Sequence, residues 1–219
     1  MNQIELFSSL PIDVLAFEQQ THKRGYKLIA GLDEVGRGAL AGPVVAAAVI
    51  LPLGLRIEGV DDSKKLSPET RERLYEIIMV KALAVGIGMG SHSLIDSINI
   101  LQATRHAMQE AVLQLLPQPD YLLIDGISTI DSPYPQKTIK KGDSLSLSIA
   151  AASIIAKVTR DRLMCEMDVV HPGYGLAGHK GYGSASHMAA IRQIGPSAIH
   201  RLTFGGVKGV KEHIACPSF

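Results

Sequence analysis

The sequence is short of cysteine, of net charge and of long apolar runs, and each shortage excludes a class of protein. Cys165 and Cys216 are its only cysteines. They are too few and too far apart for a disulfide framework or a four-ligand zinc site, so we expect two unpaired thiols in a reducing compartment. The net charge is only +1. Overall basicity would therefore not attract a polyanion, and a nucleic acid would need a locally basic surface.

No segment has the pattern of a membrane span or a secretory signal. The uncharged stretch from Ala39 to Leu55 is interrupted by glycines and prolines, and it falls short of the ~18 consecutive apolar residues that a spanning helix needs. The first residues have neither a basic start nor a long apolar run. We therefore expect a cytoplasmic protein. Its 219 residues, 46% of them hydrophobic, suit one folded domain with at most a small appendage.

The apolar pattern predicts an α/β sandwich. Short apolar stretches predict strands over Tyr26 to Asp33, Val44 to Leu51, Ala84 to Met89 and Tyr121 to Ile124, the first two forming a hairpin. Helical spacing predicts helices from the Ser67-Pro68 cap to Ala82, from Leu94 to Leu115, from Ser148 to Met167 and from Ser184 to Ile194. Strands first, then alternating helices and strands, indicate a mixed sheet that is antiparallel at its start and covered by helices.

Carboxylates stand where several of these elements begin or end. Asp33 and Glu34 come where the first strand runs into a glycine-rich turn, and both can serve one site only if the backbone bends there. Asp125 follows the last strand and precedes a glycine, which repeats the arrangement. Asp143 lies just before the small-residue helix. Because sites commonly form at strand ends, these acids could converge.

Converging carboxylates would repel one another without cations. Oxygen ligands of this kind suit Mg²⁺ or Mn²⁺, and two such ions about 4 Å apart can activate a water and stabilise the leaving oxygen in phosphodiester hydrolysis. For each acid taken singly, a solvated turn residue or a helix cap is an equally good interpretation. From position alone, the sequence therefore indicates no more than metal-dependent phosphoryl chemistry.

Several segments, taken in chain order, resemble the motifs of the ribonuclease HII family. They are Leu32 to Gly38 with Leu40 to Val44, Asp62 to Leu66, Leu123 to Gly126, Lys141 to Ser144, Ala151 to Asp161 and His179 to Gly183. The resemblance spans roughly Leu28 to Lys208. It implies a ribonuclease H-like α/β fold, with a mixed five-stranded sheet flanked by helices and a helical C-terminal extension. We expect residues 1–27 to be a helical N-terminal extension and residues 28–219 the catalytic domain with its C-terminal appendage.

The resemblance also implies residue roles. The catalytic and metal-binding acids would be Asp33, Glu34, Asp125 and Asp143, which agrees with the positions chosen above. The substrate-binding residues would be Gly36, Arg37, Gly38, Ser63, Lys64, Lys65, Asn99, Ser153, Lys157, Lys180 and Tyr182. The glycines would let the main chain reach the 2′-hydroxyl that distinguishes RNA from DNA.

Some of these roles have plainer alternatives. Tyr182 would pack on a sugar, but it could also be an ordinary half-buried aromatic side chain. Lys64, Lys65, Lys157, Arg160 and Lys180 would supply the local positive surface, although each lysine could equally be a solvated charge. The chain departs from the family pattern at Ala39, where proline is usual, and at Leu202, where a basic residue is common. These departures put in doubt loop rigidity and one phosphate contact.

The implied activity is endonucleolytic cleavage on the 5′ side of a ribonucleotide, in RNA:DNA hybrids and at single ribonucleotides in duplex DNA. The products would carry a 3′-hydroxyl and a 5′-phosphate, the metal would be Mn²⁺ or Mg²⁺ in a two-ion site, and the role would be removal of misincorporated ribonucleotides. The rivals are a catalytically silent hybrid-binding protein and the related type HIII enzyme. Type HIII carries an extra N-terminal domain, for which about 27 residues are too few.

Weaker patterns remain. Gln3 to Phe7 resembles the short peptide by which bacterial repair proteins hold the sliding clamp, although Leu6 and Phe7 could simply pack onto the domain. We expect a monomer. The glycines at 86, 88 and 90 lack the spacing of a dinucleotide-binding loop, and the histidines at 171, 179, 187 and 200 lack metal-ligand spacing.

Overall fold

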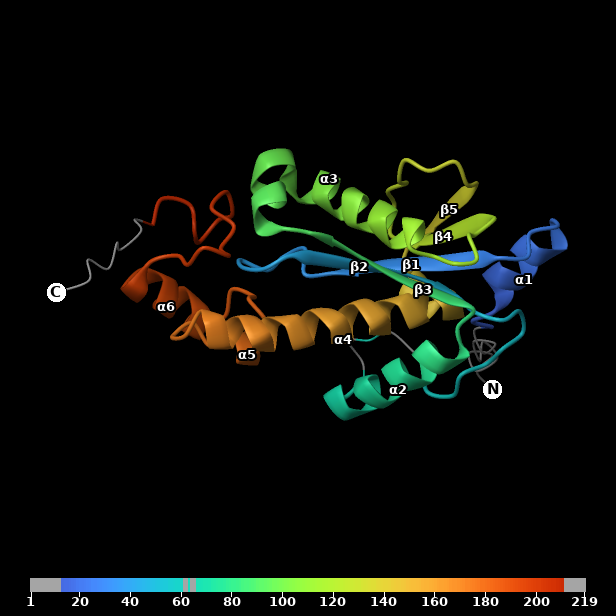
Figure 1. The fold of residues 1–219 in the computed structure, drawn as a ribbon, viewed down its shortest axis with the longest axis horizontal. Helices are drawn as coiled ribbons and strands as arrows, with labels where there is room; N and C mark the ends of the chain where they lie inside the picture. The colour runs from blue at the N-terminus through green and yellow to red at the C-terminus, as the bar shows by residue number, and fades with distance from the viewer. Residues whose placement is uncertain (1–12, 61–62, 64–65, 211–219) are drawn as a thin grey trace, which may run out of the picture.

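A computed structural model describes residues 13–60, 63 and 66–210, and the structural statements below concern these residues. The elements are α1 (Ala16–Lys23), β1 (Ile29–Val35), β2 (Val44–Ile50), α2 (Pro68–Lys81), β3 (Ala84–Gly90), α3 (His92–Leu113), β4 (Tyr121–Asp125), β5 (Gln136–Ile139), the 3-10 helix η2 (Gly142–Ser144), α4 (Leu147–Val170), α5 (Leu176–His179) and α6 (Ala185–Ile194). Helix α3 covers one face of the sheet, and α2 and α4 cover the other (Figure 1). The predicted α/β fold is confirmed.

The sheet is five-stranded and mixed, with the strand order β3-β2-β1-β4-β5. Strands β1 and β2 pair antiparallel, so the predicted hairpin is confirmed. Strands β4 and β5 continue the sheet in parallel with β1. The apolar pattern did not locate β5, because Ile139 alone is fully buried in that strand. It also did not locate the short helices η2 and α5.

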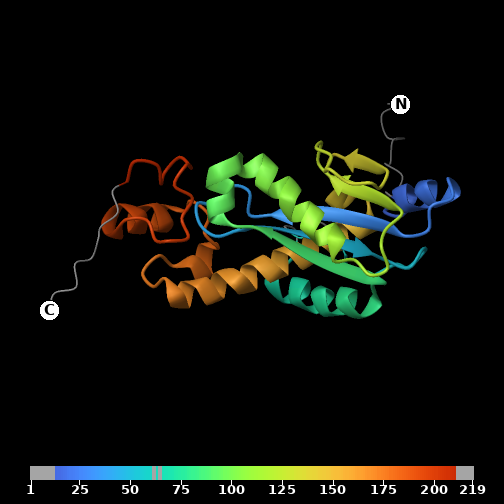
Figure 2. The same ribbon diagram turned by 45° about the horizontal axis from the view of Figure 1, so that its top comes forward.

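Helix α3 lies directly on β3, which explains the alternating glycines of that strand. A Cβ at Gly86 would lie 2.0 Å from the carbonyl oxygen of Ala111, and one at Gly88 would lie 2.0 Å from that of Ala107. Glycine therefore removes the side chains that would hold helix and strand apart. Figure 2 shows α3 running across this face of the sheet. The pattern reflects packing, which agrees with its rejection as a dinucleotide-binding loop.

The opposite face is formed by α2 and α4. Helix α2 begins as expected, with Pro68 at its first position and the Ser67 side chain accepting the Thr70 N–H at 3.2 Å. Helix α4 extends slightly beyond the predicted range at both ends. Its run of small residues lets it lie close against β1 and β2, where Ala151 and Ala152 are fully buried. This helix also carries several side chains of the candidate site.

Helix α1 is attached to the N-terminus of α4 by one buried carboxylate. Glu18 is 7% exposed, and its Oε1 accepts the Ser146 hydroxyl at 2.6 Å and the Ser148 hydroxyl at 2.7 Å. The division at residue 27 stays a prediction, and the clamp-like peptide Gln3 to Phe7 lies outside the described residues. No described helix is long and apolar enough to cross a membrane.

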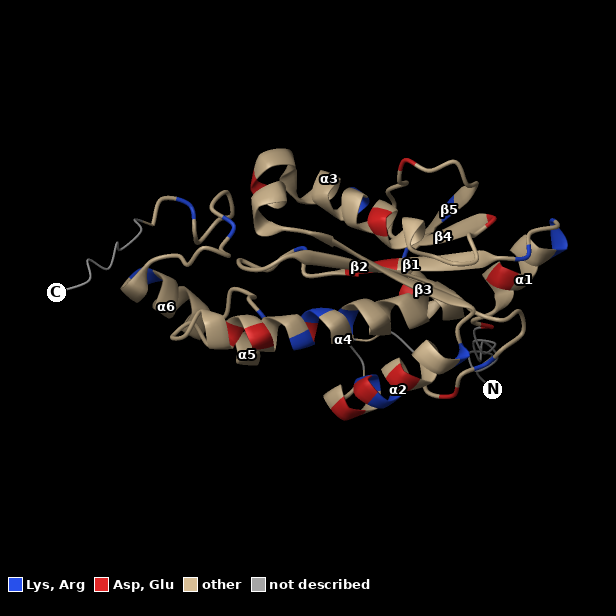
Figure 3. Cartoon of the chain, viewed as in Figure 1, with Lys and Arg blue, Asp and Glu red and all other residues tan. Residues whose placement is uncertain are grey.

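The C-terminal cap, residues 171–210, packs beyond the end of the sheet and of α4 (Figure 1). It holds α5 and α6 around a separate apolar cluster that includes Met164, Tyr174 and Ile191. Between Asp168 and Glu212 the sequence contains no Asp or Glu. The cap therefore carries cations without acids, as Figure 3 shows for its described residues.

Candidate active site

Asp33 and Glu34 lie within β1, which runs on to Val35 instead of ending at Asp33 as predicted. Both residues keep regular pairing with β2, so their side chains alternate between the two faces of the sheet. The bend that the sequence analysis required is therefore not found between them. The Asp33 side chain is on the α4 side, where Ser153 donates a hydrogen bond to it, and the Glu34 carboxylate is still near enough for its charge to raise the pKa of Asp33.

Asp125 and Asp143 reach this place from two further elements. Strand β4 runs parallel to β1 and ends at Asp125, beside Asp33. The Asp125 Oδ1 accepts the backbone N–H of Gly142 at 2.7 Å, which draws in the 3-10 helix that contains Asp143. Asp143 is 7% exposed. The sheet topology thus places Asp125 beside Asp33, and Asp143 on the segment that Asp125 holds.

The electrostatics of this edge suit a divalent cation. Burial, and then the negative charges of Glu34 and Asp125, raise the pKa of the Asp33 carboxyl well above its usual range. A bound cation would favour the ionised form, and an oxygen-only donor set fits Mg²⁺ or Mn²⁺. Among the described residues, however, no group of three or more His, Cys, Asp or Glu side chains is placed to hold a metal ion. Metal binding would have to draw the carboxylates closer together.

Two serines stand behind Asp33. Ser63 is 3% exposed and Ser153 is 4% exposed, and their hydroxyls lie 2.8 Å apart. Ser153 also donates to the Asp33 carboxylate. Ser63 thus supports Ser153, which in turn donates to Asp33, and direct contact of either serine with substrate stays a prediction.

The glycine loop, residues 36–43, joins β1 to β2 beside the acids. Arg37 is exposed, and its Nη1 donates to the Glu34 Oε1 at 3.0 Å. The Tyr182 ring lies beside Gly38, where an added Cβ would be 4.0 Å from the ring edge. Tyr182 is 37% exposed, so one part of its ring remains available to a ligand. The structure therefore brings Gly36, Arg37, Gly38 and Tyr182 together.

The predicted lysine contacts are more dispersed. Lys157 donates to Asp161 at 2.8 Å, and both side chains are largely buried. Lys180 has a left-handed backbone with φ of 52°, and its ammonium group donates to the Ala177 carbonyl oxygen and to the Cys165 sulfur. Both lysines line one shallow depression between α2 and α4. Both ammonium groups are thus hydrogen-bonded within the protein, and their role in substrate binding stays a prediction.

Asn99 lies at a break in helix α3. Its φ of 69° and ψ of 164° are not helical, and its Oδ1 accepts the backbone N–H groups of Leu101 at 3.0 Å and Gln102 at 3.1 Å. Asn99 therefore caps the second part of the helix, while its exposed side chain keeps its amide donors toward solvent. Lys64 and Lys65 lie outside the described residues.

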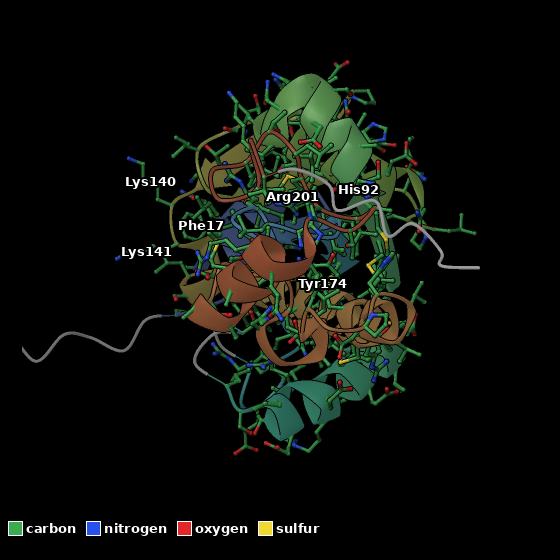
Figure 4. The ribbon with its side chains drawn as sticks, turned by 90° about the vertical axis from the view of Figure 1, so that its left-hand side faces the viewer. Phe17, His92, Lys140, Lys141, Tyr174 and Arg201 are labelled. Atoms are coloured by element: carbon green, nitrogen blue, oxygen red, sulfur yellow. The ribbon has the colours of Figure 1, made fainter. Side chains whose placement is uncertain are left out.

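The structure corrects the expected place of Arg160 and adds Arg201. Both are 0% exposed, so Arg160 cannot form part of the basic surface that the sequence analysis assigned to it. Figure 4 looks onto this end of the molecule and shows Arg201 near its centre, among the side chains of the cap. No pattern marked either residue as buried, because a buried arginine is rare and its acceptors here are backbone oxygens distant in the sequence.

Within the cap, hydrogen-bonded histidines connect Ser197 to Tyr182. The Ser197 N–H donates to His200 Nδ1 at 2.9 Å, so the neutral His200 ring carries its proton on Nε2 and donates to His187 Nε2 at 3.0 Å. His187 Nδ1 in turn donates to the Tyr182 carbonyl oxygen at 3.0 Å. His179 stacks on His187 with centroids 4.3 Å apart. These histidines are hydrogen-bonded to protein groups, which accords with their poor metal-ligand spacing.

Comparison with known proteins gives one consistent match. The family model described as Ribonuclease HII matches residues 30–207. The protein named Ribonuclease HII of Pelobacter propionicus is 71% identical over 218 residues, covering 100% of this chain and 98% of the relative. That of Geobacter sulfurreducens is 65% identical over 198 residues, covering 90% of each.

Solved structures with the same fold include two archaeal proteins at 25% identity. Ribonuclease H2 from Pyrococcus horikoshii has a TM-score of 0.69, over 83% of this chain and 96% of that one. The PCNA:RNase HII complex from Archaeoglobus fulgidus has a TM-score of 0.68, over 81% of this chain and 95% of the matched one. Bst-RNase HIII in complex with Mn²⁺ is 21% identical, with a TM-score of 0.63 over 85% of this chain and 70% of that one, which is a likeness of fold.

Proposed function

This chain belongs to the ribonuclease HII family and is an endoribonuclease of the ribonuclease H class, and we propose that Asp33, Glu34, Asp125 and Asp143 form its metal-binding catalytic site. The observation that carries this proposal is the setting of Asp33. A buried carboxylate lies between two further carboxylates at a strand end, an arrangement that is costly unless a cation or a proton compensates it. This setting favours hydrolysis over a catalytically silent binding protein.

The cation is proposed to be Mn²⁺ or Mg²⁺. Two such ions, when bound, would activate a water and stabilise the leaving oxygen. The protein's own contribution is to hold the carboxylates. Ser153 orients Asp33 through its hydroxyl, and the Gly142 N–H fixes one oxygen of Asp125 at 2.7 Å. The family's fold neighbour Bst-RNase HIII, whose structure is described as a Mn²⁺ complex, is consistent with this choice.

The proposed scissile bond is the phosphodiester on the 5′ side of a ribonucleotide, in RNA:DNA hybrids or at a single ribonucleotide in duplex DNA, with 3′-hydroxyl and 5′-phosphate products. The exposed turn at Arg37 and Gly38, with Tyr182 beside it, is the proposed contact with the ribose. A main chain that can approach closely can hydrogen-bond the 2′-hydroxyl. Removal of misincorporated ribonucleotides is the proposed role.

Cleavage of a labelled DNA duplex with one ribonucleotide tests this function. Wild type and the Asp33→Asn variant are compared with Mg²⁺, with Mn²⁺ and with chelator. The matched control is Asp131→Asn, because Asp131 is exposed in the loop between β4 and β5, where its carbonyl oxygen accepts a hydrogen bond from Gln109 on α3. Metal-dependent cutting 5′ to the ribonucleotide by wild type and the control, but not by Asp33→Asn, supports the proposal. If wild type cut the duplex with neither metal, substrate binding without cleavage would be the function that remains.

The sliding clamp is the proposed protein partner. The resemblance of Gln3 to Phe7 to a clamp-binding peptide, together with the fold neighbour described as a PCNA:RNase HII complex, supports binding of the replication sliding clamp. A pull-down with purified clamp tests it, and capture that is unchanged by the double variant Leu6→Ala, Phe7→Ala would refute it. We also propose that the protein is cytoplasmic and monomeric. Sedimentation of the purified protein would check the oligomeric state.

A further inference from the structure

The glycine loop is held from inside by the guanidinium groups of Arg160 and Arg201. Arg201 donates to the carbonyl oxygens of Gly36 at 2.8 Å, of Arg37 at 2.9 Å and of Gly42 at 2.9 and 3.1 Å. Arg160 donates to the carbonyl oxygens of Pro43 at 3.0 Å, of Ala41 at 3.2 Å and of Lys180 at 2.9 Å. Two side chains thus take five carbonyl oxygens from one short loop.

These contacts leave the outer side of the loop with free donors. Arg37 and Gly38 are exposed, and within the described residues their backbone N–H groups donate to no protein acceptor. The neighbouring N–H of Leu40 is used internally, on the Gly181 carbonyl oxygen at 2.7 Å. A peptide group whose carbonyl oxygen is fixed inward presents its N–H in a defined direction, because the peptide unit is planar. The loop therefore presents oriented donors to whatever lies above it.

The two buried arginines bring positive charge beneath the loop. Among the described residues, neither guanidinium group forms an ion pair, although both are 0% exposed. Arg160 stacks under the Tyr182 ring, 5.5 Å from its centroid, and Arg201 lies 5.0 Å from the Phe204 centroid. Asp161 acts on Arg160, and Asp96 on Arg201, through charge without a direct ion pair, so positive charge beneath the loop would favour an anionic ligand above it.

We propose that Arg160 and Arg201 are positioning residues for ribonucleotide selection: they fix the carbonyl oxygens of the glycine loop inward, so that the N–H groups of Arg37 and Gly38 face the 2′-hydroxyl and the adjoining phosphate. The inference rests on the proposed function of the site. It adds that preference for a ribonucleotide depends on two residues that never contact the substrate. Arg160 also aligns Tyr182, which would place the sugar against the same donors.

Binding of two matched duplexes tests the proposal apart from catalysis. Fluorescence anisotropy in chelator gives the affinity for a DNA duplex with one ribonucleotide and for the same duplex in all-DNA form. Arg201→Lys and Arg160→Lys keep the charge but lose the planar fork of donors. We expect each to lower the ribonucleotide preference about tenfold, as for loss of a well-aligned hydrogen bond. Affinity for the all-DNA duplex should change little.

The control variant is Arg162→Lys, two residues along α4 in an exposed ion pair with Glu72. It should leave both affinities as in wild type. In metal-dependent cleavage, the Arg201→Lys variant should raise KM more than it lowers kcat. A folded Arg201→Lys protein, checked by circular dichroism, that keeps the full ribonucleotide preference would overturn the proposal, while cleavage by wild type would leave the proposed function standing.

A measurement on wild type decides the matter if the lysine variants do not fold. Amide hydrogen exchange at Arg37 and Gly38, followed by NMR in chelator, should slow when the ribonucleotide duplex binds and stay faster with the all-DNA duplex. Equal exchange rates of these two amides with the two duplexes would refute the proposal that their N–H groups face the 2′-hydroxyl. Failure of wild type to cleave in the metal assay would count against the proposed function instead, so the two failures are distinguishable.

Discussion

The acidic edge and the glycine loop lie side by side, but they concentrate charge of opposite sign in different ways. At the edge, Asp33 has negative neighbours, and burial raises its pKa. Beneath the loop, burial lowers the pKa of Arg201 to about 9, and the nearby Arg160 adds to this effect. A guanidinium group still remains charged at neutral pH. At the acidic edge, Arg37 pairs with Glu34, whereas the two arginines beneath the loop form no ion pair among the described residues and donate to backbone oxygens.

This contrast separates the chemistry of the site from its selectivity. Clustered acids can bind cations. In the ligand-free protein, one of the acids can instead take up a proton, which removes its negative charge. The arginines are satisfied by backbone oxygens whether or not substrate is present. Loss of an acid should therefore abolish turnover and spare the fold, whereas loss of a contact beneath the loop should affect the fold as well.

Asp33→Asn should reduce kcat by on the order of a thousandfold or more, equivalent to about 4 kcal/mol of barrier, without loss of stability. In chelator at pH 7, the variant should unfold at the same temperature as wild type or above it, because it removes a buried carboxyl that burial and like charges disfavour. Calorimetry beside the cleavage assay measures both. A variant that is inactive because it unfolds below wild type would break the comparison.

Gly36→Ala should destabilise the loop by roughly 2–3 kcal/mol. Gly36 has φ of +91°, and an added Cβ would lie 2.1 Å from Arg160 Nε, so the arginine and the loop could not both keep their places. The matched control is Gly205→Ala, since a Cβ at Gly205 meets nothing within 4 Å. Urea unfolding of the two variants checks this. Equal stability would mean that Arg160 does not hold the loop as described.

Sequence reasoning reached the two regions unequally, for a physical reason. Asp125 could be chosen because a short apolar strand, an acid and a glycine form a local pattern, and parallel strands then bring it beside Asp33. Arg201 follows no such pattern, since its acceptors at Gly36 and Gly42 are more than 150 residues away. The sequence also misplaced the bend after Asp33, because the strand persists to Val35. Local patterns predict strand ends, but not which distant side chain supports a loop.

Acid should weaken the cap through His200. Burial lowers the pKa of His200 from 6.5 to about 4, so below pH 6.5 the unfolded chain takes up a proton that the folded protein does not. Stability present above pH 6.5 should be lost as pH falls toward 4, by on the order of 2 kcal/mol. The buried Asp33 acts in the opposite direction. The difference between wild type and His200→Gln therefore isolates the histidine.

Urea unfolding between pH 7.5 and 4.5 provides this measurement. The control is His106→Gln, because His106 is exposed on α3 and should leave the pH dependence as in wild type. A His200→Gln protein whose stability falls with acid as steeply as wild type would show that His200 is not what makes the cap acid-sensitive.

The smallest effect is expected at Arg162, which shares helix α4 with Arg160. Arg162 is 46% exposed in its side chain and pairs with Glu72 at 2.5 Å, and exposed ion pairs contribute about 0.5 kcal/mol or less. Arg162→Met should therefore change the free energy of unfolding by no more than that, whereas Arg160→Met, which leaves three carbonyl oxygens without their donor, should cost several times as much. Urea unfolding of the two variants compares an arginine that pairs with a carboxylate with one whose hydrogen-bond acceptors are all backbone oxygens. Equal losses would mean that Arg160 is no more than a packed side chain, and the loop would then owe its shape to Arg201.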